Sequence, residues 1–145
     1  MIRKAVGAII HNGKKFLLAQ RVMIGAGGNS SENIEPEWDI IKGGMNNDET
    51  PKDTLLRELF EETGSTDFII EKELKEPICF TFTEKIQKKT GWESQETTMF
   101  LVKYFGDKNF HPSEEIGKIS FFKKDEAIEK IKYDETKDYF RKYAP

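Results

Sequence analysis

The sequence predicts an α+β fold, in which a mixed β-sheet carries helices on both sides and residues 1–145 form one domain. Three observations predict it. Apolar and β-branched runs of strand length recur along the chain, one amphipathic helix interrupts them, and two further amphipathic helical segments close the sequence. A length of 145 residues suits one domain with a single sizeable core.

Short apolar and β-branched runs predict the strands. Residues 3–10 and 15–21 read as two strands, joined at Asn12-Gly13 by a favourable hairpin turn. The same signal predicts further strands at residues 38–42, 67–74, 76–84, 97–104 and 118–123.

The connecting segments are polar or glycine-rich. Residues 22–36 contain a Gly, Asn and Ser cluster and predict a loop that is long enough to be functional or mobile. Residues 85–91 predict a basic turn. Residues 124–131 and 134–143 predict the two closing helices, and no repeat, low-complexity tract or linker interrupts the chain.

The central helix, at residues 51–63, has clear signals at both ends. Thr50 suits the capping position, Pro51 suits the first helical position, and Gly64 suits the left-handed residue that ends a helix. Its periodicity predicts an apolar stripe on one side and three carboxylates on the opposite side. The stripe comprises Leu55, Leu56, Leu59 and Phe60, and the carboxylates are Glu58, Glu61 and Glu62.

Three carboxylates at this spacing repel one another on a helix surface. One interpretation is an exposed helix with an ordinary Arg57–Glu61 ion pair. The glycines on both sides of the helix favour another, in which the carboxylates face a fixed cavity beneath a glycine-rich loop. Clustered carboxylate oxygens suit Mg²⁺ or Mn²⁺ rather than zinc.

The spacing from Gly43 through Glu49 to the run Arg57–Gly64 resembles the Nudix box, the signature of a family of Mg²⁺-dependent pyrophosphohydrolases. Every Gly, Glu and Arg of the family pattern stands at its offset. The resemblance implies the Nudix fold, an α/β/α sandwich, over nearly the whole chain. It also implies an enzyme that attacks phosphorus with water in a nucleoside diphosphate linked to another moiety.

The resemblance also assigns roles. Metal binding falls to Glu58, Glu61 and Glu62 with the backbone near Gly43, whereas Gly44, Glu49, Arg57 and Gly64 support the motif. Two positions depart from the family pattern, because Ser65 replaces an aliphatic residue and Ile41 replaces a proline. Neither position carries chemistry, so the departures concern the tightness of the loop.

Further candidates lie outside the box. Glu115, with Glu114 as second choice, resembles the additional carboxylate that many Nudix enzymes bring to the metal; an ordinary acidic loop is the alternative. The spacing between Gln95 and Phe100 is similar to the one found in the branch of dinucleoside polyphosphate hydrolases and RNA pyrophosphohydrolases. Substrate binding is therefore expected at Arg21, Lys42 and Gln95, with a polar strand surface as the alternative for Arg21 and Gln95.

Composition limits the partners. With 23 basic and 26 acidic residues the net charge is −3, which argues against extended nucleic-acid binding but permits recognition of a nucleotide or an RNA 5′ end. No apolar run approaches the length of a membrane span. The single cysteine, Cys79, suits a reducing cytoplasm and is expected to be buried.

Two alternatives to the leading function stay open. A Nudix domain can bind a nucleotide as a sensor without turnover, although such domains usually lack box glutamates and this chain keeps them all. The substrate can instead be a non-standard nucleoside triphosphate or a nucleotide sugar. Specificity is expected in residues 22–36, 85–95 and the closing helices, where Tyr133, Tyr139 and Phe140 either stack on a base or pack in the core.

Overall fold

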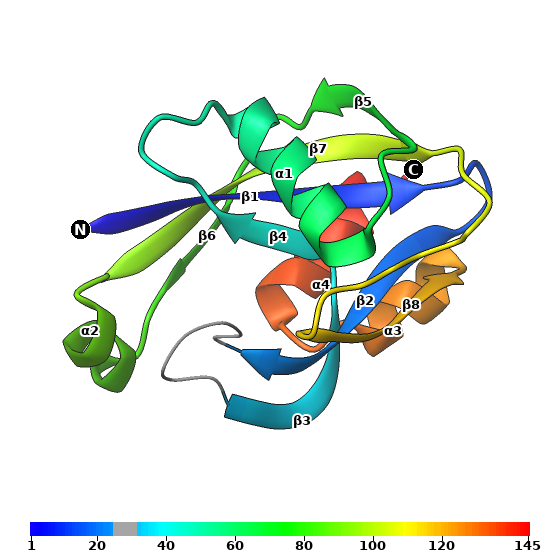
Figure 1. Ribbon diagram of the computed structural model, residues 1–145. Helices are drawn as coiled ribbons and strands as arrows, with labels where there is room; N and C mark the ends of the chain where they lie inside the picture. The colour runs from blue at the N-terminus through cyan, green and yellow to red at the C-terminus, as the bar shows by residue number, and fades with distance from the viewer. Residues whose placement is uncertain (25–31) are drawn as a thin grey trace.

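The computed structural model describes residues 1–24 and 32–145, which form one mixed β-sheet of eight strands (Figure 1). The main strand order is β3-β2-β1-β7-β5, while β4, β6 and β8 pair with β1, β7 and β2. Strand β1 runs parallel to β7 and antiparallel to β2 and β4. The strands are β1 (Ile2–His11), β2 (Phe16–Ile24), β3 (Glu32–Asp39), β4 (Ile41–Gly44), β5 (Phe68–Glu73), β6 (Ile78–Thr81), β7 (Ser94–Tyr104) and β8 (Ile116–Phe122).

Helices cover both faces of this sheet. Helix α1 (Pro51–Thr63) lies on one face, and helices α3 (Lys124–Lys130) and α4 (Asp134–Tyr143) lie on the other (Figure 1). The predicted α+β class, a mixed sheet between helical layers, is confirmed. Helix α2 (Glu84–Thr90) contributes no buried residue and projects at the end of the β6–β7 hairpin.

Two hydrophobic cores lie on the two faces of the sheet. One packs β1 and β7 residues against Leu55 and Leu59 of α1, and the other packs the sheet against α3 and α4. Successive residues of β1 alternate between the cores, as the two-residue period of a strand requires: Ile10 belongs to the first and Ile9 to the second. Strand β1 is therefore buried on both faces, which anchors the loop and helix that follow β4.

Helix α1 has the capping predicted from the sequence. The Thr50 hydroxyl accepts from the Asp53 backbone N–H at 3.2 Å, and the Asp53 carboxylate accepts from the Thr50 N–H at 3.4 Å. Gly64 ends the helix with φ 72°, in the left-handed region. A Cβ at Gly64 would lie 2.7 Å from the His111 carbonyl oxygen, so glycine also permits a close approach there.

The predicted faces of α1 need correction. Leu55 and Leu59 are buried, but Leu56 and Phe60 are 51% and 56% exposed. Glu58 and Glu62, expected on the opposite side from the apolar stripe, are buried together with Leu55 and Leu59. The reason is that the side of the helix packed against β4 carries Glu58 as well as apolar residues, and Gly43 of β4 leaves room for the Glu58 carboxyl group.

Several element boundaries also differ from the expectations. Residues 22–36 were expected as a loop, but β2 continues to Ile24 and β3 begins at Glu32; residues 25–31 lie outside the described part. Among the described strands, β3 pairs only with β2, and such an edge position tolerates Pro36. The expected strand at residues 38–42 is divided between the end of β3 and the beginning of β4.

The expected turn at residues 85–91 is helix α2. Thr83 caps it by accepting from the Ile86 N–H at 3.4 Å, and Gly91 ends it with φ 80°. Cys79 is exposed rather than buried, because it lies on the outward side of the short strand β6. Among the described residues, no helix has the length and apolar character needed to cross a membrane.

Candidate active site

The candidate active site begins where the Gly43-Gly44 end of β4 passes the buried side of α1. A Cβ atom at Gly43 would lie only 2.0 Å from the Glu58 carboxyl carbon, and one at Gly44 would lie 2.4 Å from Arg3 Nη2. Both glycines therefore make room for side chains that approach the backbone closely. Neither of these two approaches was predicted from the sequence.

Arg57 joins the loop to the helix. Its Nε and Nη2 donate to the two Glu49 oxygens at 2.7 and 2.8 Å, a paired geometry that favours arginine over lysine. Nη2 also donates to the Gly44 carbonyl oxygen at 3.1 Å. The hydrogen bonds from Arg57 lower the pKa of Glu49 to about 2, so this carboxylate stays ionised. The loop is thereby held against α1 by a charged pair.

Arg57 also reaches two of the helix carboxylates. Its Nη1 donates to Glu58 at 2.9 Å and to Glu61 at 3.3 Å. The Glu61 side chain is 52% exposed and lies outside the cavity formed by the glycine loop and Glu58. Of the three predicted helix carboxylates, the structure thus brings Glu58 and Glu62 to the wall of the cavity, whereas Glu61 does not line it.

Glu58 and Glu62 are buried acids. Loss of solvation raises the pKa of Glu58, and it raises the pKa of Glu62 to about 7, although the nearby Arg21 acts in the opposite direction. Oε2 of Glu62 is buried and has no hydrogen-bond partner among the described residues. A buried carboxylate oxygen without a partner is unfavourable unless a cation or a donor from a ligand reaches it.

Arg21 holds Glu115 near Glu62 in the cavity. Its Nη1 donates to Glu115 Oε2 at 3.1 Å, and its Nη2 lies 3.8 Å from Glu62 Oε1. The backbone holds Glu115 next to β2, because the Val22 N–H donates to the Glu115 carbonyl oxygen at 2.8 Å. Glu115 lines the cavity, whereas the second-choice residue, Glu114, is exposed and does not.

Gln95 is buried, and both its amide oxygen and its amide nitrogen form hydrogen bonds within the protein. Its Oε1 accepts from Arg3 Nη1 at 2.6 Å, and its Nε2 donates to the Thr97 hydroxyl at 3.1 Å. The parallel pairing of β1 and β7 puts Arg3 opposite Gln95. Gln95 therefore orients Arg3, a cavity residue that the sequence reasoning missed, since no local pattern reveals a contact between residues 92 positions apart.

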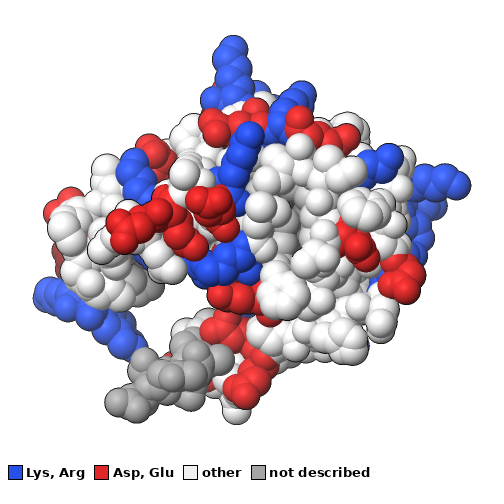
Figure 2. Space-filling model, turned by 45° about the horizontal axis from the view of Figure 1, so that its top comes forward, with Lys and Arg blue, Asp and Glu red and all other residues white. Residues whose placement is uncertain are grey.

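These residues surround a cavity of about 360 Å³ with mixed charge. Lys42, the third predicted substrate-binding residue, lines it and pairs with Asp39 at 3.0 Å. Acidic and basic side chains are intermixed on the face of the molecule shown in Figure 2. The cavity is lined by Arg3, Arg21, Ile24, Lys42, Gly43, Gly44, Glu58, Glu62, Phe80, Gln95 and Glu115.

The donor set of this cavity suits a hard divalent cation. Carboxylate oxygens are the ligands that Mg²⁺ and Mn²⁺ prefer, and the Glu62 oxygen without a partner is available to one. As the side chains stand, no three acidic, histidine or cysteine residues of the described ranges are close enough together to enclose an ion. Arg21, between Glu62 and Glu115, is the cation next to these carboxylates.

The two departures from the family pattern fit the fold. Ile41 is buried in the core against α1. Ser65 is buried as well, where its hydroxyl accepts from the Asp67 N–H at 3.1 Å and its own N–H donates to the Thr63 hydroxyl at 3.1 Å. Hydrogen bonds thus shape the chain after Gly64 where the family has an aliphatic side chain.

Comparison with known proteins identifies the family. The sequence pattern of the NUDIX domain matches residues 1–143. The chain belongs to the Nudix family. The expectation of a Nudix hydrolase is thereby confirmed, as is the Nudix fold.

Two named relatives of this Nudix chain are RNA pyrophosphohydrolases. The one from a Nitratiruptor species is 30% identical over 124 residues, which cover 74% of this chain and 80% of that one. The one from a Sulfurovum species is 32% identical over 114 residues, which cover 75% of this chain and 73% of that one.

Solved structures show the same Nudix fold at lower identity. A C. elegans Ap4A hydrolase in a binary complex superimposes with a TM-score of 0.72 at 21% identity, over 98% of this chain and 95% of that one. The MutT protein from Methanosarcina mazei Go1 superimposes with a TM-score of 0.71 at 22% identity, over 97% and 91% of the two chains.

Proposed function

We propose that this Nudix hydrolase cleaves a phosphoric anhydride bond in a nucleoside polyphosphate, either at the 5′-triphosphate end of an RNA or in a dinucleoside polyphosphate. The observation that carries the proposal is the pairing of buried Glu58 and Glu62 with cationic side chains in one cavity. A polyphosphate needs cations along its length, and a hydrolytic site needs carboxylates at the reacting phosphorus. The names of the relatives support the same substrate class.

In this proposal the residues divide into two groups. Glu58, Glu62 and Glu115 hold a divalent cation, Mg²⁺ or Mn²⁺, with Glu61 and the Gly43 backbone at its margin. Arg3, Arg21 and Lys42 line the cavity as cations and bind the phosphate oxygens. Gln95 orients Arg3, while Glu49 and Arg57 hold the loop. When bound, the divalent ion supplies charge neutralisation to the phosphates and acidifies water.

A cytoplasmic location is part of the proposal. Its support is the exposed, unpaired thiol of Cys79, which persists in a reducing compartment. The mixed surface charge supports recognition of an RNA end rather than of an extended nucleic acid.

The test is a substrate panel with Mg²⁺: diadenosine tetraphosphate, a short 5′-triphosphorylated RNA, nucleoside triphosphates and ADP-ribose. We expect release of phosphate or pyrophosphate from the RNA, or of two mononucleotides from the dinucleotide. Glu62→Gln is expected to lower kcat by about 10²- to 10⁴-fold with an unchanged circular dichroism spectrum. Glu73→Gln, on the exposed part of β5, is the matched control with wild-type turnover.

Two outcomes would overturn parts of the proposal. Full activity of Glu62→Gln would remove Glu62 from the reacting centre. Tight binding of a panel member without turnover of any would favour a nucleotide sensor over a hydrolase.

A further inference from the structure

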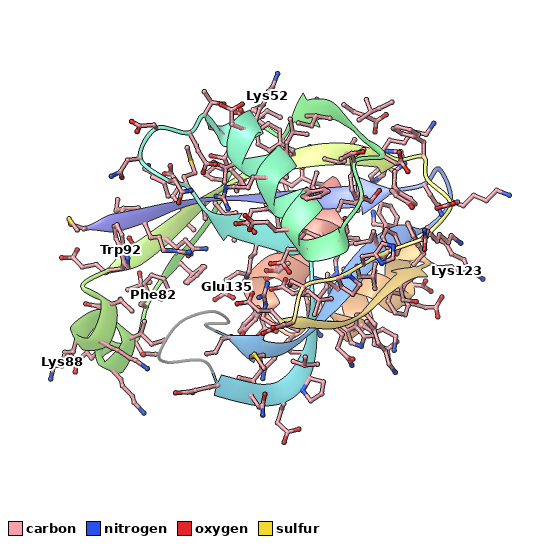
Figure 3. All side chains as sticks on the ribbon, viewed as in Figure 1. Lys52, Phe82, Lys88, Trp92, Lys123 and Glu135 are labelled. Atoms are coloured by element: carbon pink, nitrogen blue, oxygen red, sulfur yellow. The ribbon has the colours of Figure 1, made fainter. Side chains whose placement is uncertain are left out.

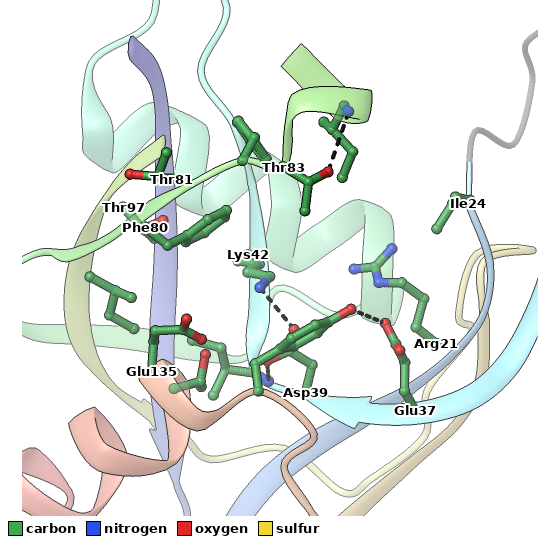
Figure 4. Close-up of a pocket in the computed structure, with 16 residues that line it drawn as sticks. Arg21, Ile24, Glu37, Asp39, Lys42, Phe80, Thr81, Thr83, Thr97 and Glu135 are labelled. Atoms are coloured by element: carbon green, nitrogen blue, oxygen red, sulfur yellow. Dashed lines mark hydrogen bonds and ion pairs between the residues drawn. The ribbon is translucent and has the colours of Figure 1, made fainter. Parts of the chain in front are cut away.

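A second cavity adjoins the candidate active site. It has a volume of about 470 Å³ and shares Arg21, Ile24, Lys42 and Phe80 with the first cavity (Figure 4). A ligand whose phosphates occupy the first cavity can therefore extend its remaining part into the second. A volume of this size lies within the range that small-molecule ligands occupy.

The walls of the second cavity suit a flat ring. Phe80 and Phe82 meet edge to face with ring centroids 5.1 Å apart, and Tyr133 contributes a third aromatic ring. Ile40, Ile78 and Ile86 add aliphatic surface. Aromatic side chains stack on any nucleobase, because every base has a π face. Figure 3 shows Phe82 on the β6 side of the site and Glu135 at the beginning of α4.

Two of the three carboxylates that line this cavity are already engaged. Glu37 accepts from the Tyr133 hydroxyl at 2.8 Å and pairs with Lys132 at 3.3 Å. Asp39 accepts from the Ile40 N–H at 2.8 Å and pairs with Lys42 at 3.0 Å. These contacts satisfy the two side chains from within the protein.

Glu135 differs from these two. Glu135 is exposed to solvent and, within residues 1–24 and 32–145, its carboxylate has no hydrogen bond and no ion pair; it lines the cavity from the first turn of α4 (Figure 4). A carboxylate accepts hydrogen bonds and donates none when ionised. It therefore favours a ligand edge that presents N–H donors, and it repels a phosphate or an edge of acceptors.

Guanine is the common base whose edge meets this requirement. Its N1–H and N2–H₂ groups are adjacent donors that a carboxylate can accept in parallel, whereas adenine presents an N1 acceptor beside its N6 donor. Cytosine has the same conflict, since its N3 acceptor lies beside the N4 donor. We propose that the second cavity binds the nucleobase of the substrate, and that Glu135 makes it select guanine over adenine.

This inference rests on the proposed function, because the base is taken to belong to the hydrolysed nucleotide. The test compares kcat/KM for GTP, inosine triphosphate and ATP, and for three short 5′-triphosphorylated RNAs that differ only in beginning with G, inosine or A. Inosine keeps N1–H and lacks the N2 amino group, so it reports on the second hydrogen bond. Binding of the α,β-methylene analogues of GTP and ATP provides a readout independent of turnover.

We expect the wild-type protein to favour guanine over adenine by about tenfold or more, with inosine between them, because hydrogen bonds to charged groups discriminate at this level. Glu135→Gln is expected to bring the guanine-to-adenine ratio close to one in both turnover and binding. Phe80→Ala is expected to weaken binding of both analogues by about tenfold and to leave their ratio unchanged, since stacking does not distinguish bases. Glu129→Gln, exposed on α3, is the control and keeps the wild-type ratio.

The outcomes separate the two proposals. If the wild-type protein hydrolyses guanine and adenine nucleotides equally, or if Glu135→Gln keeps the preference, base selection by Glu135 is overturned and hydrolysis stands. If the wild-type protein hydrolyses neither these substrates nor diadenosine tetraphosphate, the proposed function fails. A guanine preference in analogue binding, abolished by Glu135→Gln, would then still support the base site.

Discussion

Arg21 and Glu115 are 94 residues apart in the sequence and joined by a hydrogen bond of 3.1 Å between Nη1 and Oε2. The same guanidinium lies 3.8 Å from Glu62, so one cation serves two carboxylates that come from different elements. Since both carboxylates are proposed metal ligands, Arg21 and a divalent ion compete for them. Arg21 also lines both cavities, which gives it phosphate oxygens as alternative partners.

Arg21→Ala is expected to lower kcat/KM for a polyphosphate substrate by about 10- to 100-fold, mainly through a higher KM, because a charged hydrogen bond to phosphate is lost. The Mg²⁺ concentration that gives half-maximal activity should not rise, since a competing positive charge is removed. Steady-state kinetics with varied substrate and varied Mg²⁺ measure both quantities. Arg141→Ala, which removes a surface pair with Asp138, is the control. A large rise in the Mg²⁺ requirement would contradict the competition.

Gly43→Ala tests the close approach of β4 to α1. The added methyl would lie 2.0 Å from the Glu58 carboxyl carbon, so Glu58 or the loop must move. A misplacement of this size at a reacting centre lowers kcat by about 10²-fold. Gly91→Ala is the control, because the added methyl would have no atom within 4 Å. Its φ of 80° is strained for alanine, so this variant should be less stable but keep the wild-type kcat. The measurements are kcat and the melting temperature of each variant. Equal kcat values for the two variants would contradict the steric argument.

Glu49 predicts a pH dependence of stability. Hydrogen bonds from Arg57 hold its pKa at about 2, below the ordinary value of 4.5. A lowered pKa means that the folded state favours the ionised form, so this stabilisation is complete above pH 4.5 and is lost as the pH falls toward about 2. Denaturant unfolding across this window should show a shallower decline for Glu49→Gln than for the wild type. Glu84→Gln, exposed on α2, should follow the wild-type curve.

Gln95 and Arg3 are expected to act as one unit. Gln95→Ala removes the 2.6 Å hydrogen bond that orients Arg3, so its effect on KM should approach that of Arg3→Ala. The double variant should then be little worse than either single one, since contacting residues are not additive. A double-mutant cycle on kcat/KM measures the coupling. Additive effects would show that Gln95 and Arg3 contact the substrate independently.

Much of α1 was predictable because its signals are local. Thr50, Pro51 and Gly64 act within one turn of their own positions, and the structure has each of them in the expected role. The orientation of the helix was not predictable from periodicity. A pattern of apolar residues does not reveal that Glu58 and Glu62 are buried while Leu56 and Phe60 are exposed.

The remaining site depends on pairings between distant strands. Glu115 reaches the cavity because the turn before β8 lies against β2, and Arg3 reaches it because β1 runs parallel to β7. Neither of these strand pairings can be predicted from the sequence around these residues. The Gln95 position was recognised from a family spacing, but its hydrogen bonds with Arg3 and Thr97 emerged only from the three-dimensional structure.

The ends of α1 are secured by Thr50, Asp53 and Gly64, and Glu62 contributes to neither end. Burial of its carboxylate is therefore unfavourable for the fold, apart from the nearby Arg21, and the proposed metal site would give it a role. If Glu62 has the proposed role, a descendant of this chain that replaced it by an apolar residue of similar size would lose hydrolysis and gain thermal stability. On the same proposal, an inactive member of such a lineage would arise by a single substitution and would keep both the fold and the two adjoining cavities.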